Sequence, residues 1–133
     1  MKALLSFTSD FLRNHVQLVL NAHNVPTQSI DSQLLQSEFF QAADADFIIT
    51  DEFNVSNILN NNNLSSCKIL VISGEAQTHA SIYIEMLKNV DGVIHQDFSD
   101  ETLIQAMEEI SNGLSLIPQN LFSVSEKPFQ PSQ

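Results

Sequence analysis

The strongest constraint on the fold is a regular alternation between short runs typical of β-strands and longer segments with helical periodicity. Each of five short runs is followed by apolar residues at the spacing of an amphipathic helix, in units of about 20 to 25 residues. The expected strands are residues 3–7, 25–30, 47–50, 68–72 and 93–95. Such alternation is typical of a parallel sheet, since parallel strands need long crossovers. The sequence therefore predicts one α/β domain with helices on both faces of the sheet.

Local signals place the ends of several elements. Thr8 and Ser9 are candidate N-caps of the first helix, and Ser99 begins a capping sequence for the last. An Asn-Gly pair at residues 112–113 is expected to end that last helix. Pro26 has no amide hydrogen to donate, so it confines the second strand to a sheet edge or to the start of a strand. The second helix is expected over residues 34–40 and the fourth over residues 82–87.

Five short parallel strands suit the flavodoxin-like order 2-1-3-4-5, in which function lies at the carboxyl ends of the strands. In that order the first, third and fourth strands end beside one crevice. Their ends carry an aromatic-hydroxyl pair, an acidic pair and a Ser-Gly turn, namely Phe7 and Thr8, Asp51 and Glu52, and Ser73 and Gly74. The fifth strand ends at residues 95–97. The crevice is therefore the expected position of any site.

The charge balance and the apolar content exclude several classes of partner. The chain has 16 acidic and 5 basic side chains, for a formal net charge of −11. Nucleic acids and anionic membranes attract clustered Lys and Arg, whereas the basic residues here are scattered. No run of about 18 apolar residues predicts a membrane span. The single cysteine, Cys67, fits a reducing compartment and is expected to be buried, so we expect a cytoplasmic domain.

Motifs of common enzymes are missing from the chain. It has only three glycines and lacks the phosphate-binding and nucleophile-elbow patterns. His79 and His95 are far apart and no cysteine joins them, so no zinc site is expected. The hydroxyls of Thr8 and Ser9 at a helix N-terminus could bind an anion weakly. A small flavodoxin-like ligand-binding or enzymatic domain stays open, although we expect no enzyme and no cofactor.

The order and spacing of several segments resemble a response-regulator receiver domain, particularly the NarL/LuxR branch. Residues 45–51 are similar to the third strand that ends in the phosphoacceptor aspartate, and residues 68–73 to the fourth strand that ends in a switch hydroxyl. Residues 91–97 and the helix that follows are similar to the fifth strand and last helix of that branch. The resemblance covers residues 2–122 and implies a phosphoacceptor role for Asp51 and a switch role for Ser73.

The sequence also departs from that family. Phe7 and Thr8 stand where the family has a metal-binding acidic pair, and a hard cation such as Mg²⁺ prefers carboxylate oxygens. Gln96 stands in place of the family's lysine, and Val93 in place of its aromatic switch residue. We therefore expect a degenerate receiver that binds Mg²⁺ poorly and acts without phosphorylation. A phospho-competent receiver that uses Asp51 is the alternative, and Asp51 as a merely exposed strand-end carboxylate is a second.

The resemblance implies the N-terminal half of a LuxR-type two-component regulator of transcription. Residues 1–122 would form the receiver-like domain, and residues 123–133 a linker or flexible tail. DNA would be bound only by a C-terminal domain that this chain lacks. We expect a homodimer through helix faces, with residues 103–110 or the first helix as the surface, and a sensor kinase or small ligand as a further partner. The acidic charge is read as a solvated surface rather than a working metal site.

Overall fold

A five-stranded parallel sheet forms the centre of the computed structural model, which describes residues 1–30, 45–60, 67–74 and 88–116. The strand order is β2-β1-β3-β4-β5. The strands are β1 (Ala3–Ser6), β2 (Thr27–Ser29), β3 (Phe47–Asp51), β4 (Lys68–Ser73) and β5 (Gly92–His95). Both the parallel sheet and the order 2-1-3-4-5 confirm the prediction from sequence. The helices expected over residues 34–40 and 82–87, His79 and the tail after residue 116 lie outside the described residues.

The edge strand β2 is shorter than the sequence predicts. The amide of Val25 donates to the carbonyl of Leu20 and so belongs to the end of the preceding helix rather than to the sheet. The carbonyl of Pro26 accepts from the amide of Ala3, and only after this contact does strand pairing begin, at Ala3 with Thr27. Pro26 thus precedes an edge strand, as its missing amide hydrogen requires.

Three helices are described, and two of them begin at serine caps. The helices are α1 (Asp10–Ala22), α3 (Val55–Leu59) and α5 (Asp100–Ser111). The Ser9 hydroxyl accepts from the amide of Leu12 at 3.2 Å, and the Ser99 hydroxyl accepts from the amide of Thr102 at 3.1 Å. Of the two candidate caps before α1, the cap is therefore Ser9, and Thr8 is available for another contact. Asn112 ends α5, and Gly113 follows with a φ of 94°, a conformation that glycine adopts without strain.

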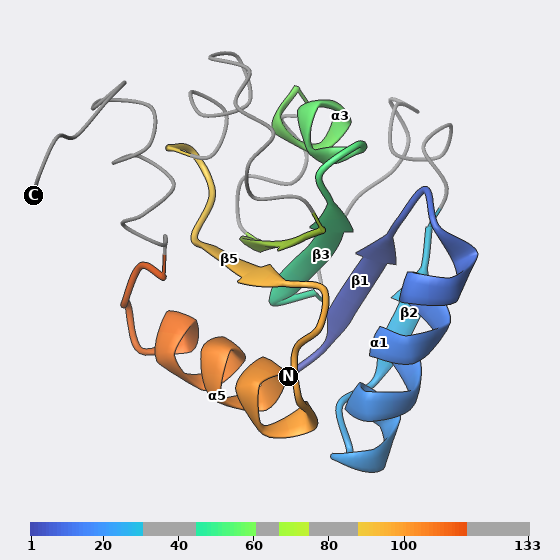
Figure 1. The fold of residues 1–133 in the computed structure, drawn as a ribbon. Coiled ribbons are helices and arrows are strands. Elements are labelled where there is room, and N and C mark those ends of the chain that lie inside the picture. Colours follow the sequence, from blue (N-terminus) through green and yellow to red (C-terminus); the bar gives the residue numbers. More distant parts are fainter. Residues whose placement is uncertain (31–44, 61–66, 75–87, 117–133) are drawn as a thin grey trace, which may run out of the picture.

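The helices cover the two faces of the sheet (Figure 1), with α1 and α5 on one face and α3 on the other. The larger core lies between the sheet and α1 and α5, and it contains Leu5, Phe47 and Leu70 from the strands. The smaller core lies on the α3 side and contains the buried thiol of Cys67, as expected. This two-sided burial explains why the strands β1 and β3 are buried along their whole length.

The apolar stripe of α5 belongs to the core. Its members Leu103, Ala106, Met107 and Ile110 are each at most 3% exposed. This stripe covers the sheet, so a dimer contact through residues 103–110 could use only the other faces of the helix, and that contact stays a prediction. Glu108 on the same helix is exposed.

The chain returns to the sheet after α5. The amide of Val93 donates to the carbonyl of Leu116 at 2.9 Å, and the amide of Leu116 donates to the carbonyl of Asp91 at 3.0 Å. Leu116 thus lies along β5 in a single parallel bridge with Gly92. A Cβ atom on Gly92 would lie 2.7 Å from the Cδ1 atom of Ile110, so glycine lets α5 pack closely on this strand. In the part of the chain that the structure describes, no helix is long and apolar enough to cross a membrane.

Candidate functional site

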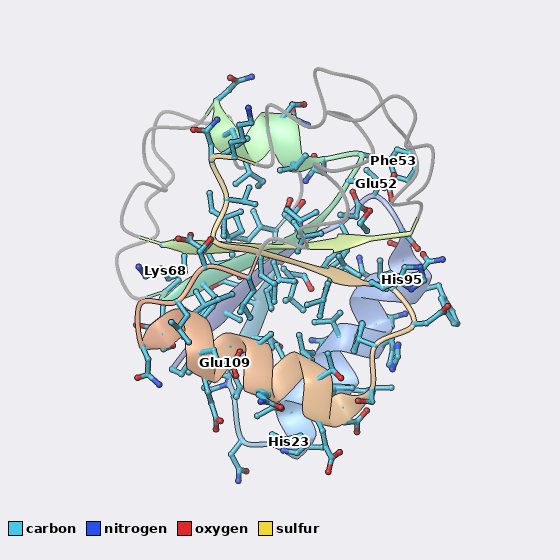
Figure 2. All side chains as sticks on the ribbon, turned by 60° about the vertical axis from the view of Figure 1, so that its left-hand side comes forward. His23, Glu52, Phe53, Lys68, His95 and Glu109 are labelled. Carbon is cyan, nitrogen blue, oxygen red and sulfur yellow. The ribbon has the colours of Figure 1, made fainter. Side chains whose placement is uncertain are left out.

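The carboxyl ends of the strands gather polar side chains at one edge of the sheet. Figure 2, which views the sheet nearly edge-on, places Glu52, Phe53 and His95 together at this edge, while Lys68 lies at the opposite edge where β4 begins. Because all strands run in the same direction, the residues that follow β1, β3 and β4 meet here. The crevice expected from the sequence is therefore the place to look for function.

Asp51, the last residue of β3, is buried, with only 3% of its surface exposed. Its Oδ2 atom accepts from both the amide and the hydroxyl of Thr8, each at 2.7 Å. Its Oδ1 atom accepts from the amides of Phe53 and Asn54, each at 3.0 Å. Four donors thus surround one carboxylate, as the burial of a charged group requires. The interpretation of Asp51 as an exposed strand-end carboxylate is wrong.

Thr8 connects the loop after β1 to the end of β3. Its backbone amide and its hydroxyl both donate to Asp51. A neutral residue thus stabilises the carboxylate at a position where the resemblance implies an acidic one. Hydrogen bonds from neutral donors to a carboxylate are short and strong, and they need no cation. The loop before α1 is therefore held to β3 by hydrogen bonds from within the chain.

A second buried pair supports this loop and was missed by the sequence reasoning. The Asn54 side-chain amide donates to the hydroxyl of Ser6 at 2.7 Å and to its carbonyl at 3.2 Å. The side-chain amide of Asn57 in turn donates to the side-chain carbonyl of Asn54 at 2.7 Å. Both Ser6 and Asn54 are buried, so these bonds tie the end of β1 to the start of α3. A serine ending an otherwise apolar strand was the available signal, although its partner lies 48 residues away.

Glu52 joins the ends of β3 and β4. Its Oε1 atom accepts from the amide of Gly74 at 2.6 Å and from the hydroxyl of Ser73 at 3.3 Å. The structure thus brings Asp51 and Ser73, the two site residues inferred from the resemblance, to the same edge of the sheet. It also gives Glu52 a contact with the Ser73 hydroxyl that the sequence did not predict.

The four positions expected to depart from the receiver pattern differ in their locations. Thr8 contacts Asp51, and Gln96 lies exposed beside Gly74, where an added Cβ atom would lie 2.6 Å from the Gln96 Oε1 atom. Phe7 instead packs against the larger core. Val93 is 5% exposed and pairs with Val71 inside the sheet. Only Thr8 and Gln96 therefore lie at the polar edge.

A pocket of about 280 Å³ opens at this edge. Its described lining includes three carboxylates and two phenylalanines and contains no Lys or Arg: Ser9, Phe11, Leu12, His15, Asp51, Glu52, Phe53, Ile72, Gly74, Gln96 and Asp97. Beside it, the ring of His15 stacks on Phe98 with centroids 4.9 Å apart and joins α1 to the loop before α5. Three carboxylates line this pocket, and only Asp51 among them is buried, whereas Asp97 is exposed.

The residues present do not fit the Mg²⁺ ion that the fold family implies. A hard cation must replace its waters with oxygen ligands that are free to coordinate it. Both oxygens of Asp51 already accept two hydrogen bonds each, and Thr8 offers a hydroxyl that donates one of them. Across residues 1–30, 45–60, 67–74 and 88–116, no group of three His, Cys, Asp or Glu side chains is arranged to hold a metal ion.

Comparison with known proteins gives matches only among solved structures. No protein-family model matches the chain, and no curated protein matches it. The isolated receiver domain of RcsB from Salmonella enterica serovar Typhimurium is similar to this chain, with a TM-score of 0.70 and 15% identity over 96% of this chain and 99% of that one. The non-phosphorylated receiver domain of RcsB from Escherichia coli matches with a TM-score of 0.63 and 11% identity, over 90% of this chain and 98% of that one.

A longer regulator matches in the same way. The response regulator ChrA of a haem-sensing two-component system has a TM-score of 0.66 and 14% identity, over 99% of this chain and 67% of that one. At such low identity the likeness concerns the fold alone. The shared strand order and these matches show that the chain has the receiver fold of response regulators in two-component systems.

Proposed function

We propose that this chain is a regulatory receiver-type domain that acts by association and not by phosphoryl transfer. The observation that carries the proposal is the saturation of Asp51 by four donors from its own chain. A phosphoacceptor carboxylate must present an oxygen to the incoming phosphorus atom. It also needs positive charge nearby, to offset the charge of the phosphoryl group.

Neither requirement is met by the described residues of the pocket. The pocket carries the carboxylates of Asp51, Glu52 and Asp97, and its described lining has no Lys or Arg. Gln96, at the position of the family's lysine, has a neutral amide. An incoming phosphoryl group would therefore meet negative charge, and it would have to displace Thr8 or the amides of Phe53 and Asn54.

Direct phosphorylation tests the proposal. The protein is incubated with Mg²⁺ and acetyl phosphate, and its intact mass is measured over time. A receiver domain that accepts phosphate under the same conditions is the positive control, and Asp51→Asn is the negative control. We expect no added phosphoryl group on the wild-type chain. A stoichiometric addition that disappears in Asp51→Asn would overturn the proposal and establish the phospho-competent alternative.

Association would occur through the outer face of α1. Phe11 is 82% exposed and Leu18 is 70% exposed. Seven residues are nearly two helical turns, so the two side chains lie on one face about 10 Å apart along the helix. Large apolar side chains gain free energy when a partner removes them from water. Since α5 buries its own stripe, α1 is the helix that supports the proposed homodimer.

A role in transcription would follow from the same assembly. One structural neighbour consists of RcsB dimers bound to DNA, and this chain covers 68% of its length. By analogy, we propose a LuxR-type regulator in the cytoplasm, in which a further domain binds DNA and a sensor or small ligand controls the dimer. The net charge of −11 disfavours DNA binding by the present residues. Reading the gene beyond residue 133 tests this directly, because a helix-turn-helix segment is expected there and any other domain would contradict it.

A further inference from the structure

Four exposed side chains on the outer face of α1 follow the spacing of a seam between paired helices. Phe11, Asn14, Leu18 and Asn21 are all exposed, and they follow one another at intervals of three, four and three residues. These are the intervals at which the contact positions of two packed helices recur. Apolar and amide side chains alternate along the series. These four residues, called the α1 seam below, therefore form a narrow strip that another helix can pack against.

The charges on the two long described helices favour a second copy of this chain as the partner of the α1 seam. Each copy has a net charge of −11, so two copies repel each other wherever their acidic faces meet. The exposed side of α5 carries Asp100, Glu101 and Glu108, and the helix has no basic residue. The α1 seam is uncharged, and the carboxylate of Asp10 beside it is paired with Arg13 at 3.0 Å. Of these two helix faces, α1 is therefore the one along which a second copy meets the smaller repulsion.

The order of the seam residues favours an antiparallel pair of helices. In that orientation Phe11 of each copy faces the partner's Leu18, and a two-fold axis passes beside Asn14, which is half a residue from their midpoint. At 1.5 Å per residue the two Asn14 side chains are offset by only about 1.5 Å along the helix. Each amide can then donate to the other. Parallel helices would instead bring the two Asp10 carboxylates together and align the two helix dipoles unfavourably.

From this spacing and these charges we propose that the α1 seam packs antiparallel against the α1 seam of a second copy, with the two Asn14 amides at the two-fold axis. This inference rests on the proposed function, because it specifies how the homodimer forms. Phe11 and Leu18 supply the apolar contacts on either side of the axis. The Asn14 pair fixes the register, since a shifted register would place an amide against an apolar side chain and leave it without its hydrogen bond.

Disulfide cross-linking of the full chain tests this arrangement and leaves Phe11 and Leu18 intact. Cys67→Ser first removes the native thiol, and Asn14→Cys or Asn21→Cys is then introduced separately. We expect Asn14→Cys to form a covalent dimer on mild oxidation, because the two positions meet at the axis within the roughly 7 Å that a disulfide can span. Asn21→Cys is the matched control on the same seam. It should stay monomeric, because its two copies lie about 20 Å apart along the helix at 1.5 Å per residue.

Sedimentation velocity of the unsubstituted chain separates a failure of this inference from a failure of the proposed function. A chain that stays monomeric would refute regulation by association and the antiparallel seam with it. If the chain dimerises but Asn21→Cys cross-links as readily as Asn14→Cys, the helices are parallel. If it dimerises and neither variant cross-links above Leu114→Cys, an exposed position after α5, another surface forms the dimer. Either of the last two results would overturn the antiparallel seam and leave the homodimer in place.

Discussion

The end of β3 and the outer face of α1 both depart from the usual distribution of polar and apolar residues, in opposite ways. Asp51 is a charged group that is buried, whereas Phe11 and Leu18 are large apolar groups that are exposed. The first is compatible with a stable fold because four donors from the chain satisfy the carboxylate. The second leaves apolar surface in water, which a partner can cover.

Asp51 therefore contributes to the stability of the fold, whereas Phe11 and Leu18 are available for interaction with a partner. Asp51, for which the family resemblance implies a phosphoacceptor role, accepts four hydrogen bonds from its own chain. The three most exposed large apolar side chains among the described residues are Phe11 and Leu18 on α1 and Phe53 in the loop before α3. A regulator that acts by association needs accessible apolar groups and has no use for an accessible phosphoacceptor. Substitutions in the two regions should therefore affect different measurements.

The largest effect on stability is expected for Asp51→Ala. It leaves the amides of Phe53 and Asn54 and both donors of Thr8 without their acceptor, which should lower the free energy of unfolding by about 3 kcal/mol. Urea denaturation measures this change. The control is Asp46→Ala, since Asp46 is exposed, accepts from the amide of Lys2 and lies 4.0 Å from the N-terminal amine, and the loss of these contacts should cost less than about 1 kcal/mol. Equal losses would mean that the burial of Asp51 contributes nothing.

The next largest effect is expected on α1 and should appear in association, not in folding. Leu18→Gln removes an exposed apolar side chain from each copy of the proposed dimer. Two such losses should weaken dimerisation at least tenfold, or by about 1.4 kcal/mol, in sedimentation velocity. Leu114→Gln is the matched control, because Leu114 is 55% exposed but follows α5. Association that is equally sensitive at both leucines would refute α1 as the surface.

A smaller effect is expected for Thr8→Val, which keeps the shape of the side chain and removes its hydroxyl. The Oδ2 atom of Asp51 would keep the bond from the Thr8 amide and lose the one at 2.7 Å from the hydroxyl. We expect a loss of about 1 kcal/mol in thermal or urea unfolding. Thr8→Ser retains the hydroxyl and should restore most of the stability. If Thr8→Ser is as unstable as Thr8→Val, the methyl group and not the hydrogen bond is what matters.

The smallest effect is expected for Ser73→Ala. The Ser73 hydroxyl donates to Glu52 over a longer distance, 3.3 Å, and Glu52 keeps its shorter bond from the Gly74 amide. The free energy of unfolding should fall by about 0.5 kcal/mol. Dimerisation, measured in the same preparation, should not change. A loss of stability as large as that of Asp51→Ala would mean that the Ser73 hydroxyl stabilises the fold as much as the Asp51 carboxylate does.

Much of the architecture was predictable because it depends on local and periodic signals. Alternating strand and helix patterns predicted the parallel sheet and its order, and the caps at Ser9 and Ser99 were identified from residue type and position. The meeting of Asp51, Thr8 and Ser73 at one edge followed from the parallel direction of the strands. These features require no knowledge of which side chains touch.

The contacts at the site were less predictable because their partners are distant in the sequence. Thr8 and Asp51 are 43 residues apart, and Asn54 and Ser6 are 48 residues apart. Whether a strand-end carboxylate is exposed or saturated depends on the loops that surround it. The same holds for the apolar stripe of α5, because periodicity shows that a helix has an apolar face but not what covers that face.

By itself the sequence determined the α/β class and the end of the sheet where polar residues gather, since these follow from periodicity and chain direction. The strand order was inferred from the flavodoxin-like arrangement that five short parallel strands suit. Only the tertiary structure decided that the carboxylate of Asp51 accepts hydrogen bonds from its own chain and that α5 buries its apolar face in the core. It also decided that Phe11 and Phe53 line the same pocket. The physical reason is that burial and hydrogen-bond saturation are properties of packed neighbours. Those neighbours come together only when distant segments fold onto the same sheet.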